Sequence, residues 1–447
     1  MSERPERASL TSYRASLVMP IGAQAIVDGA VLVDGDRIAW VGPRDSHPDA
    51  PQARVVELGD AVLAPGLVNA HTHLDLSVLR GLLDGLPFFE WIRGIIALRA
   101  MLTPNQTLDS ARLGAVEALE SGITTVADTA PTLASFDAML ELGLRGIGYL
   151  EVFGPDPAQS DAALAELASR VAAARSRATA RVQVGVSPHA PYSVSDALFR
   201  ATAQFARDHS LPLATHLAES QAEFDLIARG SGPFATMLAA RGIDASPRAR
   251  TPVALLDQLG VLALLAENAL LIHCVHCDEG DIRAIAKAGA SVATCPHSNR
   301  YFGHGAAPVA NFGHAGASVA VGSDSLASNS AMDLLGEART ADELPADATP
   351  LSVWRRATLT GAQALQLADG IGTLDAGKQA DLSAFSVPPG TTNTTNVRVG
   401  PKALLTVVAG VERVRGGQLV GDAAGIRARN AAVAEQLREW RQRVTRT

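Results

Sequence analysis

Two histidines separated by one residue, His71 and His73, have the spacing of a metal-chelating pair. They follow an apolar run, and side chains two positions apart on a strand point to the same side, so both imidazoles can face one ion. Two further potential ligands, His216 and Asp324, each lie at the end of another apolar run. Three imidazoles and one carboxylate suit borderline divalent metals such as Zn²⁺ or Fe²⁺ and leave a coordination position for water. We therefore expect these four residues to form a metal site.

Glu219 and His273 have side chains and positions suited to proton transfer beside such a metal. Glu219 comes three residues after His216, and His273 lies near the end of a further apolar run. A metal lowers the pKa of a bound water, and a neighbouring carboxylate can take the water's proton and pass it to the substrate. We expect Glu219, His273 and Asp324 to be catalytic. The alternative is structural, with Glu219 as an acid at a helix start and His273 as a buried barrel histidine.

These side chains lie in a segment where short apolar runs alternate with long helical stretches rich in Ala and Leu. Such alternation is typical of repeated βα units, and eight units predict a (β/α)₈ TIM barrel of the α/β class. The active site of such a barrel lies at the carboxyl ends of its strands, where five of the eleven histidines fall. The eight runs are 62–68, 123–127, 147–153, 182–186, 212–217, 269–274, 291–295 and 318–321.

The flanks of this segment have a different pattern, with short strands separated by turns. Asp34-Gly35-Asp36 between two apolar runs predicts a hairpin, and similar strands return after residue 370. We expect a small β-sandwich domain assembled from both chain termini. Its two parts would be residues 1–63 and 371–447, with the barrel at 64–370. The charged amphipathic pattern at 426–444 predicts a surface helix.

Composition limits the classes of function. The chain has 447 residues, 47% hydrophobic and 19% charged, which is typical of a soluble globular protein. A net charge of −8 without a basic block argues against nucleic-acid binding. The start of the chain lacks the apolar core of an export signal, and no apolar run is long enough to span a membrane. We therefore expect a cytoplasmic protein that acts on a small molecule.

The three cysteines and the remaining histidines are expected to be structural. Three cysteines cannot form a disulfide framework, and they favour a reducing compartment. Cys274 and Cys277 have C-x-x-C spacing, but no second pair accompanies them, so packing is the expected role. We expect loop or surface positions for His297, His304 and His314.

Four stretches carry a family resemblance: PGLVNAHTH at 65–73, HLAE at 216–219, the strand around His273, and GSD at 322–324. In this order and spacing they resemble the amidohydrolase superfamily. The resemblance implies a barrel with a β-sandwich, the metal ligands His71, His73, His216 and Asp324, and proton transfer by Glu219 and His273. Two-metal members of the superfamily use a carboxylated lysine. Because no lysine lies between His73 and Lys287, we expect one divalent metal, Zn²⁺ in the first place, as in the deaminase and chlorohydrolase branch.

Further motifs resemble deaminases of adenosine-type nucleosides and S-adenosylhomocysteine, and most closely the aminodeoxyfutalosine deaminases. They include LRG at 79–81, FEWIR at 89–93, SPHAPYS at 187–193 and SNR at 298–300. The resemblance implies an aromatic wall and contacts to ribose, to a substrate carboxylate and to the base. The residues implied are Trp91 and Phe88 for the wall, His189 for ribose, Arg93 or Arg99 for the carboxylate, and Asn299 for the base pocket.

The expected reaction is therefore hydrolytic deamination, with 6-amino-6-deoxyfutalosine converted to futalosine and ammonia in menaquinone biosynthesis. The alternatives with the same metal core are S-adenosylhomocysteine, adenosine or guanine deamination and chlorotriazine hydrolysis. A catalytically silent scaffold would lack some of the core residues, and all six are present. Related enzymes are often dimers, so a homodimer is possible. For Trp91 and Phe88 the alternative role is ordinary packing, and for the arginines it is a solvated helix face.

Overall fold

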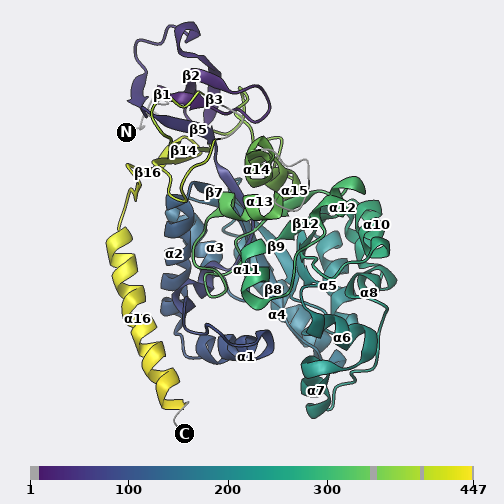
Figure 1. Cartoon of the computed structure of the whole chain (residues 1–447). Helices are drawn as coiled ribbons and strands as arrows, with labels where there is room; N and C mark the ends of the chain where they lie inside the picture. The colour runs from purple at the N-terminus through teal and green to yellow at the C-terminus, as the bar shows by residue number, and fades with distance from the viewer. Residues whose placement is uncertain (1–9, 343–349, 393–396, 445–447) are drawn as a thin grey trace.

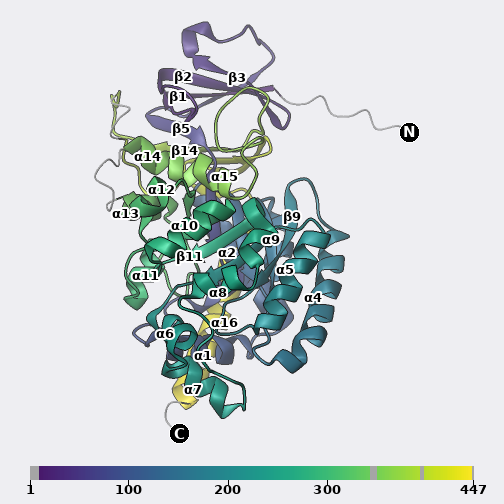
Figure 2. The same ribbon diagram turned by 90° about the vertical axis from the view of Figure 1, so that its right-hand side faces the viewer.

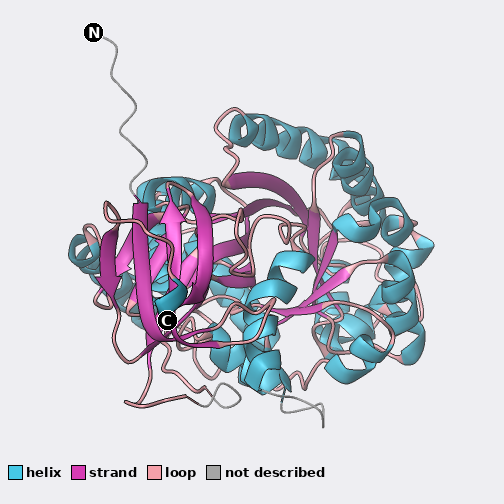
Figure 3. Cartoon of the chain, turned by 90° about the horizontal axis from the view of Figure 1, so that it is seen from above, coloured by secondary structure: helices cyan, strands magenta, loops and turns pink. Residues whose placement is uncertain are grey.

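The computed structural model describes residues 10–342, 350–392 and 397–444, and a barrel of eight parallel strands forms its centre (Figure 3). Strands that are neighbours in the barrel are consecutive along the chain, as repeated βα units require. A bridge between Thr72 and Asp324 joins the first strand to the chain just after the last. The strands are β6 (Leu67–Thr72), β7 (Ile123–Ala130), β8 (Arg145–Val152), β9 (Val182–Pro188), β10 (Leu213–Leu217), β11 (Ala269–His273), β12 (Ser291–Thr294) and β13 (Val319–Val321).

Helices surround the barrel, and several begin at side-chain caps that satisfy free backbone N–H groups. Thr103 and Gln106 form a capping box at the start of α2, and Asp278 and Asp281 form one at the start of α10. The helices are α1 (Phe88–Arg99), α2 (Pro104–Glu120), α3 (Ala134–Leu142), α4 (Ser160–Arg175), α5 (Asp196–Asp208), α6 (Gln221–Arg229), α7 (Gly232–Ala240), α8 (Pro252–Gln258), α9 (Val261–Leu265), α10 (Glu279–Ala288), α11 (Pro296–Phe302), α12 (Val309–His314), α13 (Leu334–Asp342), α14 (Pro350–Arg355) and α15 (Gly361–Ala364). None in the described residues is long and apolar enough to cross a membrane.

A second, nine-stranded mixed sheet combines both ends of the chain, as expected. β5 pairs antiparallel with β14, which brings residues of the first and last parts of the chain together. The hairpin expected at Asp34 is present, with Asp34 opposite Arg37 across a two-residue turn. The fold class is therefore confirmed. The strands are β1 (Leu10–Val18), β2 (Ile26–Asp34), β3 (Arg37–Pro43), β4 (Arg54–Glu57), β5 (Ala61–Pro65), β14 (Leu382–Ser386), β15 (Leu405–Val408), β16 (Val411–Arg415) and β17 (Gln418–Leu419).

The prediction of a single strand at 62–68 was wrong. The chain leaves the terminal sheet at Pro65 and enters the barrel at Leu67, so the run belongs to two strands in two sheets. Gly66 makes this passage possible, because a Cβ there would lie 2.1 Å from the Thr124 hydroxyl oxygen. Both halves are buried and apolar, and hydrophobicity alone cannot show that a chain changes sheets. As a consequence, His71 lies within β6 and not after it.

The terminal sheet lies at one end of the molecule, and α1, α6 and α7 lie at the other (Figures 1 and 2). The last helix, α16 (Ala423–Val444), runs along α2 on the barrel. Arg427 Nη2 donates to Glu120 at 2.6 Å, and Asn430 Nδ2 donates to the Asp109 carbonyl at 2.8 Å. Val433 packs in an apolar cluster with Leu79, Trp91 and other residues. The helix therefore stabilises the wall of the barrel beside α1.

Candidate active site

Four side chains meet at the carboxyl ends of barrel strands in the arrangement expected for metal ligands. The Nε2 atoms of His73 and His216 lie 3.3 Å apart, although 143 residues separate them in the chain. Asp324 Oδ1 lies 3.5 Å from His71 Nε2 and 3.7 Å from His73 Nε2. Gly322 permits this approach, because a Cβ there would lie 2.7 Å from the His71 carbonyl oxygen.

The hydrogen bonds of these histidines leave lone pairs free for a cation. His73 Nδ1 lies 2.7 Å from the Thr129 carbonyl and His216 Nδ1 lies 3.1 Å from the His189 carbonyl. Since a carbonyl only accepts, each Nδ1 carries the proton and each Nε2 carries a lone pair. Two facing lone pairs repel unless a cation lies between them. Both nitrogens of His71 are buried without a hydrogen-bond partner in the described residues, and burial lowers its pKa to about 4. The site therefore fits a divalent metal.

Glu219 lies just after β10, beside this set of ligands. Its Oε1 is 3.6 Å from His273 Nε2, and burial, with the charges of Asp324 and Glu223, raises the pKa of Glu219 well above its usual value. Glu223 positions it by accepting hydrogen bonds from the backbone N–H groups of Ala218 and Glu219, both at 2.9 Å. A buried carboxyl with a raised pKa can both take and deliver a proton near neutral pH.

His273 ends β11 with a φ of 71°, in the left-handed region. Its Nδ1 donates to Asn299 Oδ1 at 3.0 Å, which leaves the Nε2 lone pair on the side of Glu219. Burial lowers the pKa of His273, so the neutral form is favoured. Asn299 thus contacts His273 at the ring nitrogen opposite to the one that faces Glu219. It was expected in the base pocket, but it is not among the residues that line the cavity beside Glu219.

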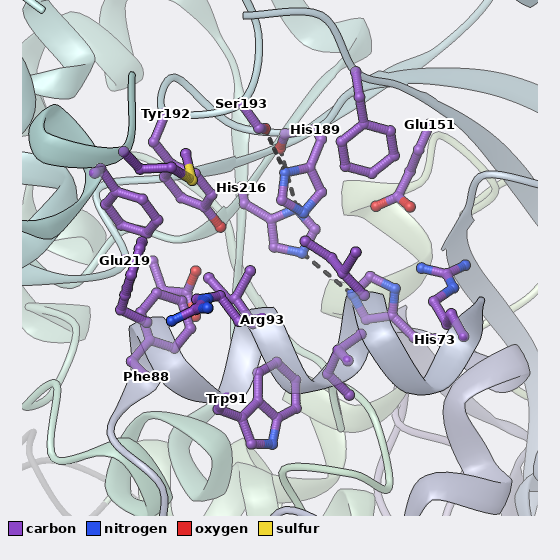
Figure 4. A pocket seen from close by; sticks show the side chains of 18 of the residues that line it. His73, Phe88, Trp91, Arg93, Glu151, His189, Tyr192, Ser193, His216 and Glu219 are labelled. Carbon is purple, nitrogen blue, oxygen red and sulfur yellow. Dashed lines mark hydrogen bonds between the residues drawn. The ribbon is translucent and has the colours of Figure 1, made fainter. Parts of the chain in front are cut away.

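A cavity of about 290 Å³ opens beside these residues (Figure 4). Five of the expected substrate residues line it: Trp91, Phe88, Arg93, Arg99 and His189. Most of the other lining side chains are apolar. The remaining lining residues are His73, Leu76, Phe89, Ile92, Ile95, Ile96, Glu151, Phe153, Pro155, Tyr192, Ser193, His216, Glu219, Phe234, Met237, Arg241, His273, Phe302 and Asp324.

The arginines of the cavity differ in how far they are already paired. Arg99 Nη2 lies 2.5 Å from Asp75 Oδ2, a carboxylate with no exposed surface. Arg93 lies 3.2 Å from Glu90 on the exposed side of α1. Arg241, at the end of α7, is exposed and forms no ion pair with another described residue. Arg241 is therefore the cation most available to an anionic ligand.

Two residues near the reacting centre were not expected there. His304 lies in a loop, as expected, but it is not at the surface: its side chain is only 7% exposed, and its Nε2 lies 3.8 Å from Glu219 Oε1. The centroid of its ring lies 4.6 Å from that of the Phe88 ring. Glu151, the other residue, comes from β8. An acid near the end of a barrel strand was the signal that could have indicated it.

Comparisons with known proteins agree with this geometry. The model of the amidohydrolase family matches residues 62–414, and a bacterial imidazolonepropionase-like composite domain matches residues 29–46. A 5-methylthioadenosine/S-adenosylhomocysteine deaminase from Symbiobacterium thermophilum is 31% identical over 82% of both chains. An aminodeoxyfutalosine deaminase from Deinococcus radiodurans is 34% identical over 76% of this chain and 82% of the relative. The structure of a zinc-bound adenosine deaminase from Xanthomonas campestris has a TM-score of 0.82 at 27% identity, covering 97% of this chain and all of that one (100%).

Proposed function

This chain belongs to the amidohydrolase family and is a hydrolytic deaminase, and we propose that its substrate is 6-amino-6-deoxyfutalosine, which it converts to futalosine and ammonia in menaquinone biosynthesis. The coarser conclusion, deamination of an adenine-type nucleoside, is supported by relatives of both kinds. The observation that carries the finer proposal is a mostly apolar cavity that is lined by Glu219 and His273 and also by Arg241, an exposed arginine that forms no ion pair with another described residue.

The chemistry divides between the metal ligands and the residues around them. A divalent metal, which we propose to be Zn²⁺, would be held by His71, His73, His216 and Asp324 and would supply the Lewis acidity that activates a water molecule. Glu219 takes a proton from that water and delivers it to the ring nitrogen beside the carbon that bears the amine. His273 Nε2 accepts a hydrogen bond from the attacking water and orients it. The water oxygen bonds to the carbon that bears the amine, the second proton of the water passes to the amine, and the C–N bond breaks to release ammonia.

The arginines support a substrate with an acidic tail. Aminodeoxyfutalosine carries a benzoate and S-adenosylhomocysteine carries an amino-acid carboxylate, whereas adenosine and 5-methylthioadenosine have no carboxylate. Because Asp75 already binds Arg99, the partners that we propose for that carboxylate are Arg241, just after α7, and Arg93, on α1. Charge-assisted hydrogen bonds from arginine to a carboxylate are among the stronger polar contacts in proteins.

The test is ammonia release by the metal-loaded protein from aminodeoxyfutalosine, S-adenosylhomocysteine, 5-methylthioadenosine, adenosine, guanine and a chlorotriazine. Aminodeoxyfutalosine is expected to have the highest kcat/KM, and Arg241→Gln is expected to raise its KM about tenfold while leaving that of adenosine unchanged. Arg200→Gln, on the exposed side of α5 and away from the cavity, is the control. Preference for S-adenosylhomocysteine or 5-methylthioadenosine would reject the finer proposal and keep the nucleoside deaminase.

A further inference from the structure

Glu151 is a buried carboxylate in the cavity that the proton-transfer steps do not use. It lies near the end of β8, is 1% exposed and lines the cavity. Its Oε1 has no hydrogen-bond partner in the described residues. A buried carboxylate oxygen without a partner is costly, and most such atoms in folded proteins are satisfied by a protein group, a water or a ligand. Glu151 therefore has an unused acceptor atom in the wall of the cavity that is proposed to hold the substrate.

The position of Glu151 places it toward the sugar end of a nucleoside in the cavity. Glu151 and Glu219 lie on opposite sides of His216 (Figure 4). A Glu151 carboxylate oxygen lies within 4.8 Å of ring nitrogens of His189 and His216. If Glu219 serves the ring nitrogen beside the amine, the far side of the purine, which carries the sugar, is directed toward Glu151 and His189. Sugar hydroxyls are neutral hydrogen-bond donors, and a carboxylate can accept their hydrogen bonds without a second ion nearby.

A second metal ion is the competing ligand for the group formed by Glu151, His189 and His216. His216 has no nitrogen left for it, because Nδ1 donates to the His189 carbonyl and Nε2 faces His73 Nε2 at 3.3 Å. His189 Nδ1 is also engaged, with the Ser193 hydroxyl 2.7 Å away. The geometry therefore favours a hydroxyl ligand.

We propose that Glu151 is a specificity-determining residue that accepts hydrogen bonds from the sugar hydroxyls of an adenine-type nucleoside. This role rests on the proposed function. It is independent of the acidic tail, because the sugar is common to all the nucleosides of the panel. A hydrogen bond to a charged acceptor typically changes affinity about 10- to 100-fold.

The first experiment uses the wild-type, metal-loaded protein with adenosine, 2′-deoxyadenosine and 3′-deoxyadenosine. At least one deoxynucleoside is expected to have a kcat/KM about 10- to 100-fold below that of adenosine. Calorimetric binding of the products inosine, 2′-deoxyinosine and 3′-deoxyinosine is expected to show the same order, which separates binding from the chemical step. This comparison needs no variant, so it does not depend on how a substitution affects folding.

The second experiment repeats the series with Glu151→Gln. The variant is expected to lose activity on adenosine by the same factor, mainly through KM, and to keep its activity on the discriminated deoxynucleoside. Its metal content should remain one ion per chain. Glu279→Gln is the matched control, because that side chain is 85% exposed on α10 and lies outside the cavity.

The outcomes distinguish the two proposals. Three outcomes would overturn the role of Glu151 and leave the proposed function standing. They are equal wild-type activity on adenosine and both deoxyadenosines, an equal loss of activity on all three substrates in Glu151→Gln, and the loss of a second metal ion in that variant. If the wild-type protein deaminates no nucleoside of any kind, the proposed function fails and the role of Glu151 fails with it. A discrimination that disappears only in Glu151→Gln supports the assignment.

Discussion

Burial gives the side chains at the mouth of the barrel protonation states that they would not have in water. It lowers the pKa of His71 to about 4, so this imidazole is neutral and can act as a ligand at neutral pH. It raises the pKa of Glu219, so this carboxyl can hold a proton between two transfer steps. The proposed metal ligand His71 and the proposed proton-transfer residue Glu219 thus owe their protonation states to the same low-dielectric surroundings.

Glu219→Gln is expected to lower kcat by about 10²- to 10⁴-fold, because an amide cannot take the proton of water. Metal content should not change, since Glu219 is not one of the four proposed ligands. Steady-state kinetics together with elemental analysis of the purified variant test both statements. Turnover near that of the wild type would refute proton transfer by Glu219.

Glu223 gives an expected pH dependence of stability. Burial raises its pKa to about 7, above the usual value of 4.5, so the folded state binds a proton more tightly than the unfolded state. The protonated Glu223 side chain therefore contributes to the free energy of unfolding. The contribution is complete below about pH 4.5 and is lost as the pH rises through about 7. The Tm of the wild type should therefore fall more between pH 5 and pH 8 than the Tm of Glu223→Gln does. Glu166→Gln, whose side chain is 76% exposed, should behave like the wild type.

Three residues at the strand ends of the barrel have a left-handed backbone conformation, which sets the direction of the side chains in the candidate site. Ala218, His273 and Asp324 have φ values of 51°, 71° and 56°, each at or just after the end of a barrel strand. Residues other than glycine pay of order 1–3 kcal/mol for such a conformation, so the surrounding packing must enforce it. At β13 the close approach to β6 also depends on Gly322, where even a methyl group would collide with His71.

Gly322→Ala is expected to weaken metal binding at least tenfold, because the end of β13 must move away from His71 and takes Asp324 with it. Competition with a chromogenic chelator measures the affinity. Gly313→Ala is the matched control, since a Cβ there meets no atom within 4 Å. An unchanged affinity in Gly322→Ala would show that the two strands can separate without disturbing the ligands.

At the scale of the whole molecule, the proposed metal site joins parts of the chain that are far apart. His71 lies in the first strand of the barrel and Asp324 follows the last, so a metal held by both would reinforce the Thr72–Asp324 bridge that joins these two ends. The β5–β6 passage connects this point to the terminal sheet, and α16 returns from that sheet to the barrel wall. Ligand binding and folding stability should therefore be linked.

When the free metal concentration is a thousand times its Kd, binding is expected to raise the free energy of unfolding by about 4 kcal/mol, and removal of the metal should lower it by the same amount. Thermal unfolding with and without a chelator measures the change in Tm. In His71→Ala the chelator should have little further effect, because the site is already incomplete. A wild-type Tm that does not respond to the chelator would contradict a site that joins the first strand of the barrel to the chain after the last.

Local pattern was sufficient to predict the barrel and the group at its mouth. Apolar runs that alternate with helices predict parallel strands, and parallel strands in a barrel place their carboxyl ends on one rim. His71, His216, His273 and Asp324 each lie at such an end, so their convergence could be predicted from order along the chain. The same reasoning placed the hairpin at Asp34 and the terminal sheet.

Only the tertiary structure decided which side chains line the candidate active site. Asn299 lies behind His273, Arg99 is bound by Asp75, and His304 is brought beside Glu219 by a loop. The cavity acquires Arg241 from the end of α7 in the same way, whereas Glu151, near the end of β8, lies where the strand pattern could have indicated it. The physical reason is that strand ends are positioned by a repeating backbone pattern that the sequence displays, whereas loop side chains are positioned by contacts between residues that are distant in the chain.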